Sequence, residues 1–528
     1  GGVSANAIYY DGNGQSGRQP FTWYINGNVN VNLFKVIDLP FSFNLTNAGA
    51  GYNYPSLPNR LSLHPTYKWV TAHIGDISMV YSPYTLNGYQ FRGGGLDLAP
   101  PGRIKVSVMG GQFQRAVEYD STNKIIQATY RRYGYGGKIS YLRNKYTVGL
   151  TVFGAKDQVN SLKYKPDSLQ IHPQENMVVS LNLAVRPMRG LELSGEYANS
   201  AITKDLRDST KVTSANKNIL KALINTRNST SFYKAIKANL NYRYHNSVIG
   251  VGYERIDPGY ETLGAYFFNN DLENITVNFS QPFFKQKGNI SANFGYQRDN
   301  LDGKKSGSNN RNVAAVNLSF VPNQRFIFTA GYSNFSTFMY IKPVFQSINQ
   351  LTQIQNLDTL NFSQVSQNAN ANINYIFIKR VATNHSVNFN FNLLNAVDKQ
   401  GTGSNLSTFY NGAAAYTLAF VPKEITITAA YNVSYNTLGI SDFVTQGPTL
   451  SFNSKLFKKK IGTSLISSYN TSTASGVRSS DVFNIRFSAA YLLKKQNFNI
   501  SIMNQYRDVA LKGSTNDLIA TVGYSFYF

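Results

Sequence analysis

The chain contains no cysteine, and this absence excludes disulfide frameworks and thiolate metal sites. No stretch approaches the ~20 consecutive apolar residues of a transmembrane helix, so a helical membrane protein is excluded as well. The five histidines, His64, His73, His172, His245 and His385, show no paired ligand spacing. We therefore expect neither a metal site nor a cofactor.

Acidic residues are scarce. There are 27 Asp and Glu against 51 Lys and Arg, a formal net charge of +24 over 528 residues. Nucleic-acid binding is the usual interpretation of such a charge, but the basic residues lie in separate turns and not on one helix or sheet, which argues against it. No Ser/His/Asp or acidic constellation stands out, and we expect a non-enzymatic protein.

Alternating apolar and polar residues are abundant. From residue 88 onward the chain repeats one pattern, an extended run followed by a connector; Val387, Phe389 and Phe391, for example, alternate with asparagines. We count about 22–24 such runs, each about the ten residues that a tilted strand needs to cross a bilayer. With 36 Tyr and 34 Phe, this composition suits a barrel that has lipid outside and water inside.

The connectors alternate in length. Those expected to be long, and rich in Gly, Asn, Ser and Asp, are 155–175, 199–231, 254–274, 298–312, 343–358 and 397–407. Those expected to be tight turns are 99–103, 142–146, 187–190, 245–246, 284–288, 322–325, 379–384, 422–424, 458–461 and 494–497. Short periplasmic turns and long extracellular loops are typical of bacterial barrels, whereas a soluble β-sandwich has no reason to keep this alternation. The sequence therefore predicts an all-β fold, a transmembrane antiparallel β-barrel of about 22–24 strands with no separate soluble domain.

The start of the chain is less regular. We expect residues 1–20 to be an N-terminal extension and 21–528 a single barrel, with the strand phase unsettled over 21–82. No basic-then-apolar leader precedes Gly1, so we expect that any export signal peptide has been removed. Within the 199–231 loop, Asn218 to Asn225 carries an apolar stripe that predicts a helix, either folded into the barrel mouth or capping the outside.

The tight turns share a positive charge, which we call the basic rim. Its members are Arg103, Arg143, Lys145, Arg186, Arg189, Lys285, Lys287, Arg325, Lys379, Arg380, Lys423, Lys458, Lys459, Lys460, Lys494 and Lys495. Glu424 is the acid among them. The basic rim is either a set of solvated turns or a collar that touches anionic inner-leaflet lipid head groups or an acidic periplasmic partner.

The last strand, Leu518 to Phe528, alternates apolar and polar residues and ends on aromatic side chains. It resembles the carboxy-terminal signal by which bacterial outer-membrane β-barrels are recognised for insertion. The resemblance implies an outer-membrane location, with Tyr524, Phe526 and Phe528 read by the barrel-assembly machinery.

A hairpin near residue 80 is the most individual passage of the chain. It comprises Gly75-Asp76, the segment 82–88 (SPYTLNG) and Phe91-Arg92-Gly93, followed by Pro100-Pro101-Gly102 and the Gly-rich strand around Met109. This pattern is similar to one found in large outer-membrane proteins of Bacteroidota, and fimbrial ushers carry a faintly similar hairpin. The resemblance covers about 40 residues and implies an outer-membrane location and an origin in Bacteroidota.

Two functions compete on the sequence. The first is a pore or transport channel, because barrels beyond about 16 strands leave an aqueous lumen unless something fills it. The second is a non-enzymatic accessory or structural subunit of an outer-membrane protein secretion or barrel-assembly complex of Bacteroidota. A TonB-dependent transporter is disfavoured, since strands already begin near Phe21 and leave no room for a plug. The expected partners are outer-membrane lipid or lipopolysaccharide, the barrel-assembly machinery, and other outer-membrane or periplasmic subunits, with no nucleic acid.

Overall fold

A computed structural model describes most of the chain. The described residues are 1–13, 19–47, 60–119, 128–164, 171–208, 219–266, 268–304, 310–334, 337–341, 360–400, 403–438, 441–510 and 513–528. The chain divides into two compact units: unit 1 holds Asn26–Asn278 and Gly295–Asn312, and unit 2 holds Gly2–Ile25, Phe279–Phe294 and Val313–Phe528. Four strands have residues in both units, namely β2 (Phe21–Leu33), β15 (Leu272–Phe283), β16 (Gly288–Arg298) and β17 (Asn310–Asn323).

Unit 1 is built from antiparallel strands joined in chain order. Its own elements are β3 (Ile37–Thr46), β4 (Arg60–Leu63), β5 (Thr66–Tyr67), β6 (Val70–Val80), β7 (Asn87–Leu98), β8 (Ile104–Gln114), β9 (Arg132–Leu142), β10 (Tyr146–Asp157), β11 (Glu175–Met188), β12 (Leu191–Thr203), the 3-10 helix η2 (Ile219–Ala222), β13 (Thr230–Tyr244) and β14 (Ser247–Ile256).

Unit 2 continues the same antiparallel pattern with longer strands. Its own elements are β1 (Gly2–Gly12), β18 (Phe326–Ser333), β19 (Thr337–Ile341), β20 (Leu360–Lys379), β21 (Thr383–Gln400), β22 (Gly403–Phe420), β23 (Ile425–Leu438), β24 (Ser441–Leu456), β25 (Ile461–Ala474), β26 (Val477–Leu493), β27 (Gln496–Val509) and β28 (Gly513–Tyr527).

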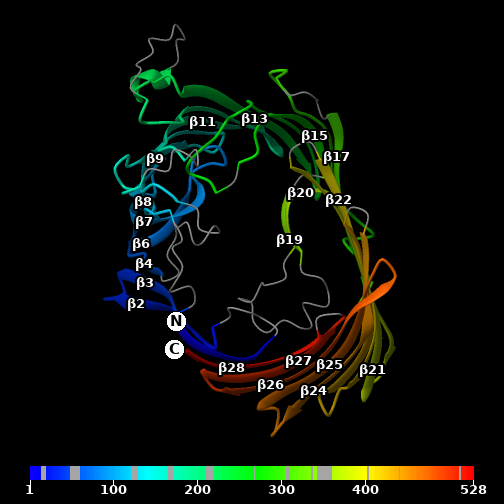
Figure 1. Ribbon diagram of the computed structural model, residues 1–528. Helices are drawn as coiled ribbons and strands as arrows, with labels where there is room; N and C mark the ends of the chain where they lie inside the picture. Colours follow the sequence, from blue (N-terminus) through cyan, green and yellow to red (C-terminus); the bar gives the residue numbers. More distant parts are fainter. Residues whose placement is uncertain are drawn as a thin grey trace. The chain divides into compact units, whose positions relative to one another are not determined.

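The first and last strands close the sheet. β1 pairs with β28 from Gly2 opposite Tyr527 to Gly12 opposite Asp517, and Figure 1 shows the two ends of the chain side by side. All 28 strands belong to one sheet. Closure removes the unpaired edges that an open sheet would leave. The fold is therefore the predicted all-β, closed antiparallel barrel.

The strand count is higher than the sequence suggested. β4 and β5 occupy one position between β3 and β6, and β18 and β19 both pair with β20, so the 28 strands fill two fewer positions, that is 26. Residues 1–20 are also not a mere extension, because Gly2–Gly12 is β1. Its small and polar residues hide the alternation, and its pairing with β28 makes it a strand.

The predicted tight turns are all present. Each of the ten lies between two consecutive strands of the structure, and further short turns follow β2 at 34–36 and β5 at 68–69. The long loop expected at 397–407 is wrong, because β21 continues to Gln400 and β22 starts at Gly403, with Gln400 paired to Gly403. Where a strand extends beyond the bilayer its residues are polar on both faces, so its sequence resembles that of a loop. The loop expected at 343–358 lies outside the described residues.

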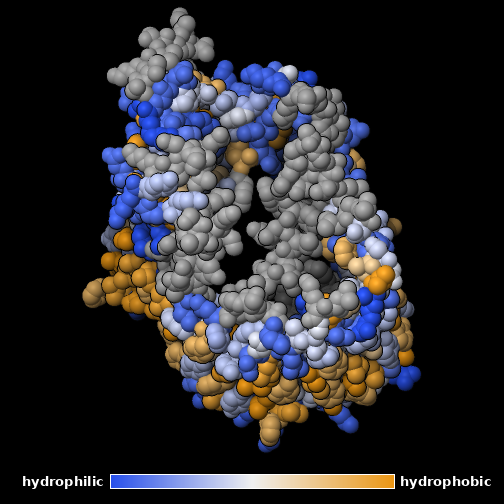
Figure 2. Space-filling view, viewed as in Figure 1, coloured by the Kyte–Doolittle hydropathy of each residue, from blue (hydrophilic) through white to orange (hydrophobic). Residues whose placement is uncertain are grey.

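The two faces of the unit 2 sheet differ sharply. The outer face presents large apolar side chains, such as Phe389 at 51% and Val522 at 55% exposure, and Figure 2 shows hydrophobic residues gathered over the outside of β24–β28. The inner face carries amides and hydroxyls, including Asn432, Ser468 and Asn484. None of the described residues form a helix long and apolar enough to cross a membrane.

The inner face of unit 1 is apolar instead. Ile77 and Phe91 from the strands pack with Phe113 and Phe153 into a buried cluster, which also receives Leu86 and Leu263 from two loops. The water-filled interior expected from composition is therefore replaced here by a packed core. On the opposite face, η2 covers Met177 and Ala201 with Leu220 and Ile224, so the predicted helix is one 3-10 turn that caps the outside.

Candidate functional site

A glycine sets the turn between β11 and β12. Gly190 has a φ of +86°, and a Cβ at this position would lie 2.3 Å from the carbonyl oxygen of Arg243 in β13. The close approach also allows a backbone hydrogen bond, in which the Arg243 N–H donates to the Gly190 carbonyl at 2.7 Å. Only a residue without a side chain allows this approach, which brings Arg189 beside the end of β13.

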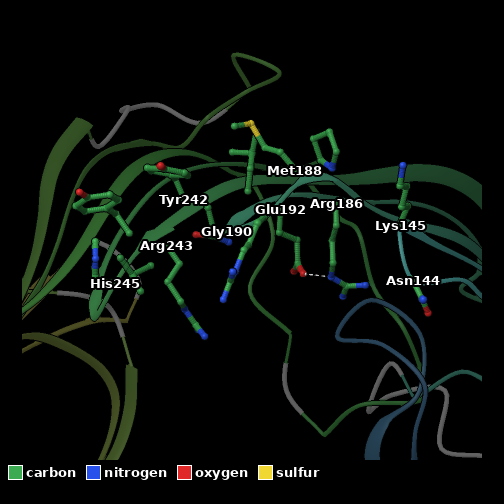
Figure 3. Close-up of a pocket in the computed structure, with 15 residues that line it drawn as sticks. Asn144, Lys145, Arg186, Met188, Gly190, Glu192, Tyr242, Arg243 and His245 are labelled. Atoms are coloured by element: carbon green, nitrogen blue, oxygen red, sulfur yellow. Dashed lines mark hydrogen bonds and ion pairs between the residues drawn. The ribbon is translucent and has the colours of Figure 1, made fainter.

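A groove opens at this turn, and we call it the turn groove. It has a volume of about 1110 Å³. Its polar lining comes from three neighbouring turns and includes Asn144, Lys145, Arg186, Arg189, Glu192, Asn241, Arg243 and His245. Figure 3 shows Arg186, Glu192 and Arg243 extending to one side of the sheet, while Met188 and Tyr242 point to the other. The side shared by Arg186 and Arg243 is the inner face, because exposed Tyr242 and Leu240 mark the outer one.

The turn groove is electropositive. Arg186 forms an ion pair with Glu192 at 2.7 Å, but both side chains are exposed, so the pair stabilises the fold little. In the described part of the chain Lys145, Arg189 and Arg243 have no carboxylate within ion-pair distance. Arginine presents a planar fork of donors that matches carboxylate and phosphate oxygens. The arrangement therefore suits an anionic ligand.

The basic rim residues fall where the sequence predicted them, in turns or at strand ends. In unit 1 the turn groove brings Lys145, Arg186 and Arg189 together. Arg143 donates a 3.0 Å hydrogen bond to the hydroxyl of Tyr141.

Apart from Arg103, which is also in unit 1, the remaining members of the basic rim are in unit 2, and one of them is neutralised. Glu424 pairs with Lys459 at 2.5 Å and with Lys455 at 2.9 Å. The hydrogen bond from Lys459, followed by that from Lys455, lowers the pKa of the Glu424 carboxyl. Lys458, Lys460, Lys494 and Lys495 have no ion pair of this kind among the described residues.

Sequence reasoning missed Arg243. It is the penultimate residue of β13, and attention to the turns alone passed over it. The alternation of the strand could have indicated it. Arg243 is two positions after Asn241, so both side chains lie on the inner face, and a tight turn follows directly after Tyr244.

Two loops cross-link above the inner face of unit 1, and we call the pair the loop clamp. It consists of the β6–β7 loop, residues 81–86, and the β14–β15 loop, residues 257–271. The Thr262 hydroxyl donates a 2.7 Å bond to the Thr85 carbonyl, and the Asn87 N–H donates a 2.9 Å bond to the Gly264 carbonyl. The segment 82–88, singled out by sequence for its resemblance, is thus half of a fixed internal structure.

Two tyrosines anchor the loop clamp. Tyr84 is 1% exposed and its hydroxyl donates to Glu254 of β14, while Tyr260 is fully buried. Burial, and then the neighbouring carboxylate of Glu254, raises the pKa of Tyr84. Burial likewise raises the pKa of Tyr260, with a smaller contribution from Glu196. Both phenols therefore stay protonated and act as donors.

The other candidate residues have simpler surroundings. Tyr524 packs on Phe498 with ring centroids 4.8 Å apart, and Phe526 lies 5.8 Å from Phe528, so the aromatic end of β28 is in place. Its role as an insertion signal stays a prediction. His64 and His73 touch through their Nδ1 atoms at 2.8 Å, yet the described residues contain no group of three or more His, Asp or Glu side chains arranged to hold a metal ion.

A closed antiparallel sheet with an apolar outer face is the architecture of transmembrane β-barrels, which in bacteria lie in the outer membrane. The chain is an outer-membrane β-barrel protein. Among solved structures it is similar to the P pilus usher (PapC) translocation pore, with a TM-score of 0.38 and 11% identity over 100% of this chain and 99% of that one.

Two further solved structures are similar to the chain. One is a mutant ferric enterobactin receptor (PfeA) from Pseudomonas aeruginosa, with a TM-score of 0.40 and 10% identity over 99% of this chain and 80% of that one. The other is OccAB3 of Acinetobacter baumannii, with a TM-score of 0.31 and 10% identity over 73% of this chain and 98% of that one. No protein-family model matches the chain, and no curated protein matches it in sequence. We draw no functional argument from similarities this low.

Proposed function

We propose that the protein is a non-enzymatic channel that carries hydrophilic solutes across the outer membrane. The observation that supports this most is a polar row across the inner face of six strands of unit 2. Its members are paired in register and are Thr426, Asn453, Ser464, Ser488, Ser501 and Thr521. Hydroxyl and amide side chains on the face opposite the lipid are expected of a wall that meets water.

A conductance measurement tests the channel. The folded protein, purified in detergent and checked by its heat-dependent mobility on gels, is added to planar lipid bilayers. Stepwise conductance increases are expected, with the same preparation heated before addition as the matched control. Folded protein that inserts into the bilayer without conducting would overturn the proposal.

The turn groove is our proposed docking site for an acidic periplasmic segment. Because Arg186 and Arg243 extend on the inner side and not on the lipid side, a polypeptide carboxylate fits better than a lipid head group. Replacing Arg189 and Arg243 with Gln should weaken the binding of a poly-glutamate peptide at least several-fold, in a salt-dependent way. Equal loss of binding to anionic vesicles would favour the lipid instead.

An accessory role in a Bacteroidota secretion or assembly complex is our second candidate, and one contact favours it. Arg92 and Asp76 form a bidentate ion pair, at 2.8 and 2.9 Å, on the outer face of β6 and β7 beside exposed Ile74 and Leu61. Charged groups facing lipid are costly, so a protein neighbour would suit them better. Complexes extracted gently from native membranes should then lose a partner in the Arg92→Ala variant, whereas Ile74→Val should retain it.

A further inference from the structure

An arginine lies at the centre of the inner wall of unit 2, where most side chains are uncharged. Arg486 is at the middle of β26, opposite Ile466 of β25 and Met503 of β27 in the strand register. It has the parity of Asn484 and Ser488, so its side chain belongs to the inner face.

The rows on either side of Arg486 are polar and almost uncharged. Toward the turns lies the row of Ser464, Ser488 and Ser501 described above. Toward the other end of the strands lie Ser468, Asn484 and Gln505, which are joined by hydrogen bonds of 3.3 and 2.8 Å. These amides and hydroxyls carry no charge that would neutralise a guanidinium.

No carboxylate pairs with Arg486 in the described part of the chain. Its Nη2 reaches only the sulfur of Met503 at 3.6 Å, and its Nε is buried without a hydrogen-bond partner. The nearest acid on the paired strands is Asp517 of β28, which lies in the row of Asn484 and Gln505. Its carboxylate accepts a 2.7 Å hydrogen bond from the Tyr10 hydroxyl.

A half-buried guanidinium without a partner costs stability. Leaving a buried donor unsatisfied is unfavourable, and an apolar residue between Ile466 and Met503 would pack without that cost. The apolar neighbours hold the aliphatic stem, while the donor fork faces the same side as the serine row. On the turn side of Arg486, a cavity of about 620 Å³ is lined by Ser464, Ser488 and Ser501 together with the ion-paired Glu424 and Lys455.

We propose that Arg486 and the serine row form a binding subsite for an oxyanion, the carboxylate or phosphate group of a solute. The guanidinium supplies charge and a bidentate fork, and the hydroxyls of Ser464 and Ser488 supply further donors. The idea that the subsite binds transported solutes rests on the proposed channel function. The idea that it binds an anion does not.

Two measurements test the subsite. The first is the reversal potential of the bilayer channel in a KCl gradient. Arg486→Gln should lower the chloride-to-potassium permeability ratio about two- to threefold, whereas Arg486→Lys should keep it, because a mid-wall charge acts on ions at close range. Lys494→Gln, a change of one charge in an exposed turn, is the matched control and should have a smaller effect.

The second measurement needs no conductance. Phenylglyoxal modification of Arg486 in the folded wild-type protein is quantified by mass spectrometry with and without inorganic phosphate or citrate. Protection of Arg486, with Arg325 modified equally in both samples, supports the subsite even if the protein proves not to conduct. Conducting channels whose ion selectivity is unchanged by Arg486→Gln, together with no protection by either anion, would overturn it.

Discussion

The hydroxyl of Tyr260 donates a 2.8 Å hydrogen bond to the backbone carbonyl of Tyr84, joining two loops that are 176 positions apart in the chain. Both residues are buried, so the bond forms away from water and leaves no free donor. The loop clamp is therefore held by a few specific bonds, and each can be removed singly.

Tyr260→Phe and Thr262→Ala should each weaken the loop clamp by about 1 kcal/mol, because each removes the donor to a backbone carbonyl of the β6–β7 loop. Limited proteolysis of the folded protein should then cleave residues 257–266 several-fold faster. Tyr197→Phe, on the exposed outer face, is the control. If a variant that carries both Tyr260→Phe and Thr262→Ala is cleaved at the wild-type rate, apolar packing alone holds the loops.

The loop clamp should open at high pH. Burial raises the pKa of both Tyr84 and Tyr260, so their contribution to stability is complete below the ordinary tyrosine pKa of about 10 and is lost as the pH rises above it. Proteolysis of the loops, measured from pH 8 to about 11, should accelerate only above about 10. The Tyr260→Phe variant should show a weaker acceleration; an identical profile would assign the effect to other groups.

Gly190→Ala should disrupt the turn groove. The left-handed backbone costs an L-residue about 1–2 kcal/mol, and the new Cβ would also meet the Arg243 carbonyl at 2.3 Å. Gly476→Ala is the matched control, since Gly476 has a φ of +78° but nothing within 4 Å of a Cβ. Heat-induced unfolding followed by gel mobility should show a larger loss for Gly190→Ala. Equal losses would mean that the sheet shifts to accept the methyl group.

The basic rim of unit 2 should act as a summed field. Changing Lys458, Lys459, Lys460, Lys494 and Lys495 together to Gln should leave folding intact but weaken association with anionic vesicles or an acidic partner, and this effect should fade at high salt. Lys459→Gln alone should do least, because its charge is already balanced by Glu424. If the five-fold variant binds as the wild type does at low salt, the basic rim is only a set of solvated turns.

Periodicity predicted the barrel and all ten tight turns, because a hairpin places its turn residues and its alternating faces in one short stretch of sequence. The extent of β21 and β22 was not predictable in this way, since polar strands beyond the membrane have no lipid-facing residues to mark them. The strand at Gly2–Gly12 was missed for a related reason: its pairing partner lies at the far end of the chain.

The functional residues divide along the same line. Lys145, Arg186 and Arg189 were predicted because charged turns are visible locally. Arg243 was missed although its inward parity is visible locally, because only the turns were searched for charge. Arg486 was missed because what distinguishes it is its neighbours on the adjacent strands. The loop clamp could not be foreseen either, since its two loops are brought together only by the closed sheet.

Pairing of β1 with β28 also has a consequence for how the protein is made. The Tyr10 hydroxyl bonds to Asp517 across 507 positions, so the seam joins one strand that is synthesised early with one that is synthesised much later. Contacts of such long sequence separation form slowly, and until they form both strands are open edges that invite aggregation. The chain must therefore be kept unfolded, or held by a helper, until β28 has been synthesised.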